Sequence, residues 1–235
     1  MSVMVLLALG VVVVVVIAVV GFHLEQKRRD RVLAYALGRA WRYDGEDPSL
    51  VDAWPGEPFG EGDNRRARSV LSGQESGREF VAFDYSYQTH TNTSKGRRTT
   101  THRYAVCVVP LPTALGVVSV LPENLLTRAA GAAGVASDID LESEDFNRRF
   151  RVRARNAKLA SDVLPPRTMD YLVGLPDDTV PSFRLQAAHL IAWRDGRLEP
   201  ADVVRTCAVL DRVIDGIPSF VWRDAGLSGG YDPAS

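Results

Sequence analysis

The sequence contains little cysteine and histidine. Only two cysteines and four histidines occur in 235 residues. Cys107 lies in an apolar run and Cys207 on the apolar side of a predicted helix, without the spacing of a disulfide framework, so both are expected to be free core thiols in a reducing compartment. The histidines are scattered, which argues against a zinc site.

The common chemical motifs are also missing. No glycine-rich loop precedes a Lys-Ser or Lys-Thr pair, no G-x-S-x-G occurs, and the acidic run at 138–145 lacks the glycine of a calcium loop. We therefore expect no cofactor, no metal and no recognisable catalytic residue. Residues 42–235 carry a net charge of −4, which argues against nucleic acid as a partner.

Charge is absent from the first 22 residues. Residues 3–22 are almost entirely apolar and would span about 30 Å as a helix, the thickness of the hydrocarbon core of a bilayer. The run is longer than the apolar part of a signal peptide, and no A-x-A cleavage site follows it. The sequence therefore predicts an uncleaved single-pass transmembrane helix whose partner is the lipid bilayer.

Basic residues follow this run at once. Lys27, Arg28, Arg29 and Arg31 are predicted to lie at the membrane surface, and cations at this position remain on the cytoplasmic side. The expectation is a plasma-membrane protein with its N-terminus outside and its C-terminal domain in the cytoplasm. An anionic lipid or a membrane-associated protein is a further expected partner.

Four segments are predicted along the chain. They are a transmembrane anchor at 1–22, an amphipathic juxtamembrane helix at 23–42, a folded domain at 43–225 and a flexible tail at 226–235. The domain is expected to fold without the anchor. It opens with an irregular connector at 43–68, pinned by Trp54 and Phe59.

The domain is predicted to be α+β, with a mainly antiparallel sheet and flanking helices. Its strands are expected at 69–71, 78–87, 102–109, 117–121 and 139–141, with two more in 182–193 and a flexible tip at 88–101. Helices are expected after Pro122, Asn156, Pro166 and Pro200.

Four arginines alternate with apolar residues near position 150. Arg149, Arg151, Arg153 and Arg155 share one face of the predicted strand, which could hold an anionic ligand or a partner. The alternative is neutralisation by Asp138, Asp140 and Glu142 on a neighbouring antiparallel strand.

Several segments together resemble a family of single-pass membrane proteins of actinobacteria that carry a domain of unknown function. The resemblance rests on the apolar anchor, Phe83-Asp84-Tyr85, Glu142-Ser143 with residues 146–150, and residues 217–222, and covers about 31–222. It implies membrane attachment but transfers no catalytic or binding residue.

Two functions are consistent with these patterns. The first is a membrane-anchored cytoplasmic binding or scaffolding domain, because the domain offers surfaces without a catalytic motif. The alternative is a membrane-tethered enzyme whose site is assembled from distant residues. A deep pocket that gathers several candidates would favour the enzyme; these candidates are Asp84, His102, Glu142, Arg149 and Arg151.

Overall fold

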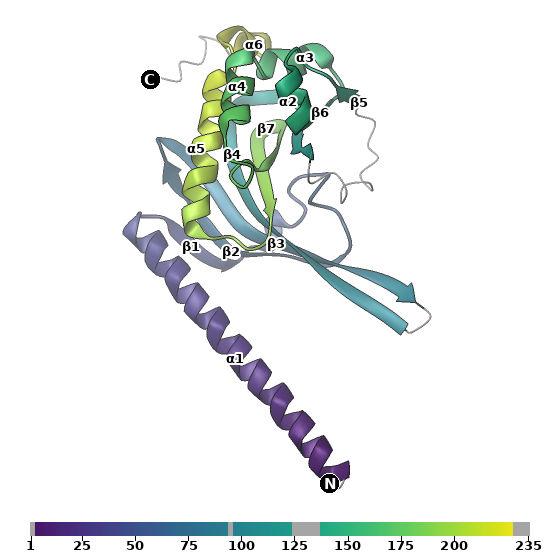
Figure 1. The fold of residues 1–235 in the computed structure, drawn as a ribbon. Helices are drawn as coiled ribbons and strands as arrows, with labels where there is room; N and C mark the ends of the chain where they lie inside the picture. The colour runs from purple at the N-terminus through teal and green to yellow at the C-terminus, as the bar shows by residue number, and fades with distance from the viewer. Residues whose placement is uncertain (1–2, 94–95, 124–136, 228–235) are drawn as a thin grey trace.

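A computed structural model describes residues 3–93, 96–123 and 137–227. A long N-terminal helix leads into a curved antiparallel sheet, and shorter helices pack on one face of that sheet (Figure 1). The elements are α1 (Val3–Gly38), β1 (Arg42–Glu46), η1 (Pro48–Leu50), β2 (Asp63–Glu75), β3 (Arg78–Thr93), β4 (Gly96–Pro122), β5 (Ser137–Ile139), α2 (Glu144–Arg149), β6 (Phe150–Ala154), α3 (Ala157–Val163), α4 (Pro166–Gly174), β7 (Ser182–Asp195), α5 (Pro200–Gly216) and α6 (Ser219–Asp224). The predicted α+β class is confirmed.

The central strand of the sheet is β4. In the described part of the chain seven strands pair in the order β1-β2-β3-β4-β6-β5, and β7 pairs with β4. All of these pairings are antiparallel. The first part of β4 pairs with β3 and β7, and its last part pairs with β6 and β7. This one strand therefore joins the two ends of the domain.

The strands are longer than the sequence predicts. The segment 117–121 is the last part of β4, because the strand passes its prolines through register shifts against β7 between Pro110 and Val118 instead of ending there. The segment 182–193 belongs to one strand, β7, instead of two. The predicted flexible tip is also wrong, since β3 and β4 stay paired as far as Thr93 and Gly96.

The two faces of the sheet are covered differently. One face carries the main core, where Phe80, Ala82 and Cys107 pack with the buried side of α5. The other face carries a second, aromatic core that includes Phe83 and Tyr85. Trp54 and Phe59, from the segment between η1 and β2, belong to this second core, as the connector prediction proposed.

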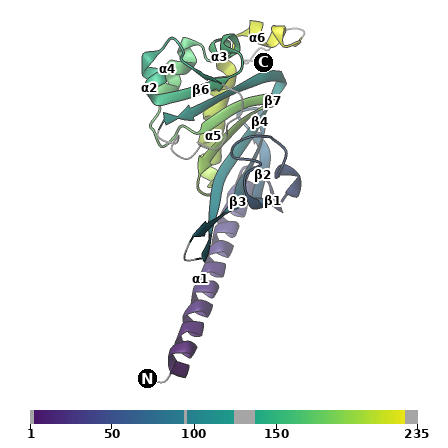
Figure 2. The ribbon, with the colours of Figure 1, turned by 90° about the vertical axis from the view of Figure 1, so that its right-hand side faces the viewer.

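Helix α1 projects from the domain, and only its C-terminal half contacts it (Figures 1 and 2). Val32, Ala36 and Trp41, which follows the helix, belong to the main core. A Cβ atom at Gly73 would lie only 2.7 Å from Trp41 Cδ1, so glycine allows the indole to press against β2. Leu37, which was also expected on the apolar side of a helix, is 69% exposed.

The predicted membrane anchor requires correction. Among the residues that the structure describes, no helix is long and apolar enough to cross a membrane. The apolar residues belong to a helix of 36 residues that continues without interruption into the charged segment 25–31. The predictions of a single-pass anchor, and of a plasma-membrane protein with its N-terminus outside and its domain in the cytoplasm, are therefore wrong.

The other predicted elements are largely found. Asn156 caps α3 through its side chain, and Pro166 and Pro200 open α4 and α5. Helix α6 was not expected. The helix predicted after Pro122 falls mostly outside the described residues, as does most of the predicted tail.

We expect the folded unit to require the second half of α1. A fragment of residues 24–225 should melt cooperatively, whereas residues 43–225 should not, because removing Trp41 and two further core side chains costs several kcal/mol out of a typical total of about 5–15 kcal/mol. Circular dichroism melts of the two fragments test this. A cooperative melt of fragment 43–225 at the temperature of the longer one would show that α1 is dispensable.

Candidate functional site

The basic residues predicted at the membrane surface have different environments. Lys27, Arg29 and Arg31 are exposed, whereas Arg28 is only 7% exposed and faces the sheet. Arg28 Nη2 lies 2.9 Å from Asp84 Oδ2 on β3 and donates to the carbonyl of Leu198 at 2.6 Å. Arg28 is therefore a structural residue that fixes α1 to the domain.

Asp84 completes this contact. Its Oδ1 accepts a hydrogen bond from the backbone N–H of Leu198 at 2.6 Å, while its Oδ2 receives Arg28. Beside it, Arg197 and Glu25 form an exposed ion pair at 2.5 Å. Three segments that are far apart in the sequence, α1, β3 and the loop before α5, thus meet at one half-buried carboxylate.

Most of the predicted arginine face is occupied by contacts within the protein. Arg151 and Arg153 both pair with Asp138, at 3.2 and 3.1 Å, in the antiparallel register that the alternation predicts. Arg149 lies at the end of α2, not on the strand, and donates to the carbonyls of Val173 and Leu175 at the end of α4. Arg155 is exposed. This agrees in part with the alternative of neutralisation: Asp138 pairs with two of the arginines, whereas among the described residues Asp140 and Glu142 form no ion pair with them.

The candidates for a dispersed enzyme site lie outside two cavities in the described residues 3–93, 96–123 and 137–227. None of the five candidates, Asp84, His102, Glu142, Arg149 and Arg151, lines either of these cavities, one beside Trp54 and one beside Asp195. Within the same described residues, no group of three or more potential metal ligands is present.

The two cysteines meet in the main core. Cys107 Sγ on β4 lies 3.7 Å from Cys207 Sγ on α5, and both thiols are free and buried. The contact with Cys207, together with burial, raises the pKa of the Cys107 thiol well above its ordinary value. A neutral thiol is a weak nucleophile, so this pair is part of the core rather than a reactive site.

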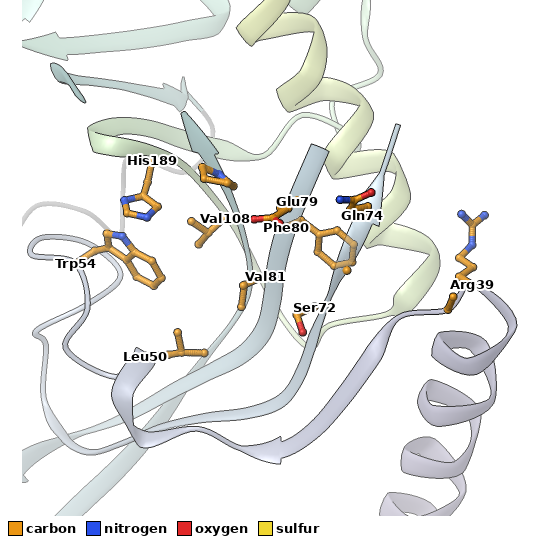
Figure 3. Close-up of a pocket in the computed structure, with 13 residues that line it drawn as sticks. Arg39, Leu50, Trp54, Ser72, Gln74, Glu79, Phe80, Val81, Val108 and His189 are labelled. Carbon is orange, nitrogen blue, oxygen red and sulfur yellow. The ribbon is translucent and has the colours of Figure 1, made fainter. Parts of the chain in front are cut away.

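The strongest candidate site is an open groove with a volume of about 680 Å³ (Figure 3). This volume is within the usual range of small-molecule sites. Most of the groove lies on the aromatic face of the sheet, and its Arg39 end also includes Gly73 and Phe80, which belong to the opposite face. The groove is lined by Arg39, Ala40, Leu50, Trp54, Ser72, Gly73, Gln74, Glu79, Phe80, Val81, Val108, Pro110 and His189.

Four strands supply the floor of the groove. Val81 on β3 pairs with Ser72 on β2 and with Val108 on β4, while Pro110 on β4 pairs with His189 on β7. Paired residues of an antiparallel sheet point to the same face, so these side chains share one surface. Leu50 and Trp54 form one wall, and the end of α1 at Arg39 lies at the opposite end (Figure 3).

The wall with Trp54 is held by a buried arginine. Arg184 on β7 donates to the carbonyls of Pro55 at 2.8 Å and Glu57 at 2.9 Å. Gly56 lies between them with φ +83°, and a Cβ there would be 2.9 Å from Arg184 Nη1. Burial lowers the pKa of Arg184 to about 10, so the guanidinium stays charged and its hydrogen bonds are charge-assisted.

The electrostatics of the groove are set by three lining side chains, Arg39, Glu79 and His189, and by Glu75, which pairs with Arg39. At the Arg39 end, both carboxylate oxygens of Glu75 accept from Arg39 Nη1 at 3.0 Å. Glu79 is exposed and has no ion-pair partner among the described residues. At the Trp54 end, burial lowers the pKa of His189, whose ring stands edge-on to the indole at 5.6 Å. The groove is therefore apolar in the middle and weakly negative overall.

Sequence reasoning did not find this groove. Trp54 was singled out, but as a residue that pins the connector, and His189 only as one of four scattered histidines. The lining residues come from the turn after α1, from η1, from four strands and from the connector, so no local spacing connects them. The sequence did show a histidine, His189, in an apolar strand, but this pattern is as typical of a core strand as of a binding site.

Comparison with known proteins gives one informative result. No protein-family model and no curated protein matches the sequence. Among solved structures, the chain is similar to the crystal structure of the mycobacterial trehalose monomycolate transport factor A, TtfA, with 13% identity and a TM-score of 0.57 over 80% of this chain and 93% of that one. This likeness supports the fold.

We expect Arg184 to control the Trp54 wall. In Arg184→Met, two carbonyls lose charged donors worth about 2 kcal/mol, so amide hydrogen exchange in residues 51–62 should accelerate about thirtyfold. Exchange measured by mass spectrometry tests this, with Arg155→Met, at an exposed arginine, as the matched control. Equal exchange in the two variants would contradict the assignment.

Proposed function

We propose that this chain is a lipid-associated binding or scaffolding protein. The observation that carries the proposal is the exposed apolar half of α1. Eleven apolar side chains between Leu9 and Leu24 are each 50–66% exposed. They include the six consecutive residues 12–17, which cover the whole circumference of the helix.

Such a surface needs a partner that accepts apolar groups from every direction. Exposure of these apolar side chains to water is unfavourable, and exposed apolar patches of this extent mark interaction sites. A protein groove would cover only one side of the helix, whereas lipid chains can surround it. We therefore favour lipid as the partner of this segment.

The domain is well placed to act as a scaffold. Because the buried Arg28 contact joins α1 to β3 and to the loop before α5, the apolar half projects in a fixed direction (Figures 1 and 2). A domain attached in this way is held at a defined distance from whatever α1 contacts. The name of the structural neighbour, a trehalose monomycolate transport factor, is consistent with a lipid-related role.

Flotation with vesicles tests the proposal. The full chain should float with phosphatidylcholine vesicles, which carry no net charge and thus report apolar contact alone. Val13→Asp with Ile17→Asp should lower the bound fraction at least about tenfold, since each side chain contributes more than about 1 kcal/mol on transfer to lipid.

Leu37→Asp is the matched control. Leu37 is as exposed as the two test residues but lies in the half of α1 that contacts the domain, so this variant should float like the unmodified chain. Unchanged flotation of the double variant, or no flotation of the unmodified chain, would overturn the proposal.

A further inference from the structure

We propose that the groove between Trp54 and Arg39 binds the single chain of an uncharged amphiphile, an acyl ester of a polyol such as a monoacylglycerol. This inference concerns a second site, separate from the apolar half of α1, and does not depend on the proposed function. It rests on the shape of the groove, on the position of His189 and on the charge at the rim.

The middle of the groove fits an apolar chain. Val81, Val108 and Pro110 form its floor, and Leu50 and Trp54 stand beside them (Figure 3). Val81 remains partly exposed although it lies in the middle of the sheet. The connector side chains Trp54 and Phe59 cover other parts of the aromatic face and leave Val81 open. An acyl chain would complete the cover that this part of the aromatic core lacks.

His189 provides a hydrogen-bond donor at the Trp54 end. Its Nδ1 is buried without a partner, and no described residue bonds to the ring. Since a buried N–H without an acceptor is costly, the neutral ring carries its proton on the other nitrogen, Nε2. Nε2 is not among the buried atoms without a partner, so it can reach a ligand. A carbonyl or ether oxygen of an ester is a suitable acceptor.

The rim favours an uncharged head group. Arg39 is already paired with both oxygens of Glu75, and the neutral ring of His189 adds no positive charge. The carboxylate of Glu79 would repel an anionic head, while Glu79, Gln74 and Ser72 can all bond to hydroxyl groups. A fatty acid is therefore excluded more strongly than its polyol ester.

Calorimetric titration of the full chain with two probes tests the proposal. Below their micelle concentrations, 1-monolauroylglycerol should bind at least about tenfold more tightly than laurate, which has the same chain and an anionic head. In Glu79→Lys the preference should narrow or reverse in favour of laurate. Because Glu79 is exposed, this substitution should not disturb the core, and the measured preference between the two probes does not depend on a variant that could fail to fold.

A second pair of variants locates the binding. Val81→Glu places a charge in the apolar floor and should weaken monolauroylglycerol binding at least about tenfold. Val117→Glu introduces the same charge at a valine of β4 that is 42% exposed and outside the groove, and should bind normally. Because both variants keep the apolar half of α1, both should still float with vesicles, which separates failure of the groove from failure of the proposed function.

The outcomes are decisive. Equal binding by the Val81→Glu and Val117→Glu variants, or laurate binding as tightly as its glycerol ester to the unmodified chain, would overturn the proposal. If Val81→Glu lowers the melting temperature, the Glu79→Lys result decides: an unchanged preference between the two probes in that variant would also overturn it.

Discussion

Burial of the Arg28 guanidinium is the constraint on which the arrangement of the whole chain depends. A charge taken out of water is tolerated when it is paired, and Arg28 Nη2 bonds to the carboxylate of Asp84 and the carbonyl of Leu198. These partners lie 56 and 170 positions away in the sequence. Arg28 Nε has no hydrogen-bond partner among the described residues but lies 3.8 Å from Glu199 Oε1. Arg28 is the buried partner, and removing the half-buried carboxylate of Asp84 would leave the guanidinium without its ion pair, so this contact joins α1 and the sheet in one folding unit.

The groove follows from the way the two faces of the sheet are covered. Helices cover the main core continuously, because α1 and α5 are long enough to lie across several strands. Among the described residues, the aromatic face is covered by Leu50 of η1 and by the segment between η1 and β2, which carries Trp54 and Phe59. A short irregular segment buries less surface than a helix. The floor around Val81 therefore stays open between the connector and the end of α1.

Local patterns predicted a large part of the fold. Alternation identified the pairing of Asp138 with Arg153, and the prolines at 166 and 200 identified two helix starts. The length of β4 was missed because the prolines at 110 and 112 are typical of strand ends, and only the pairing with β7 carries the strand past them. The membrane anchor was predicted from residues 3–22, and residues 23–42 were assigned to a juxtamembrane helix, whereas the structure has one helix, Val3–Gly38, that includes both segments.

The contacts that hold α1 and the Trp54 wall could not be predicted from the sequence for a different reason, which concerns arginine. A sequence places arginines on solvated surfaces by default, since the isolated charge is expensive to bury. Here several guanidiniums instead satisfy backbone carbonyls that end helices or lie in loops: Arg28 bonds to Leu198, Arg149 to the end of α4, and Arg184 to Pro55 and Glu57.

The planar guanidinium suits this task because its five donors can reach two or three carbonyls at once, which the ammonium of lysine cannot do in the same fixed geometry. Twenty-five arginines against three lysines make such contacts available throughout the chain. Their partners are backbone atoms, which have no signature in the sequence. In the sequence, the arginines that hold α1 and the Trp54 wall therefore cannot be distinguished from ordinary surface arginines. Only the fold brings the backbone carbonyls to which they donate within hydrogen-bond distance.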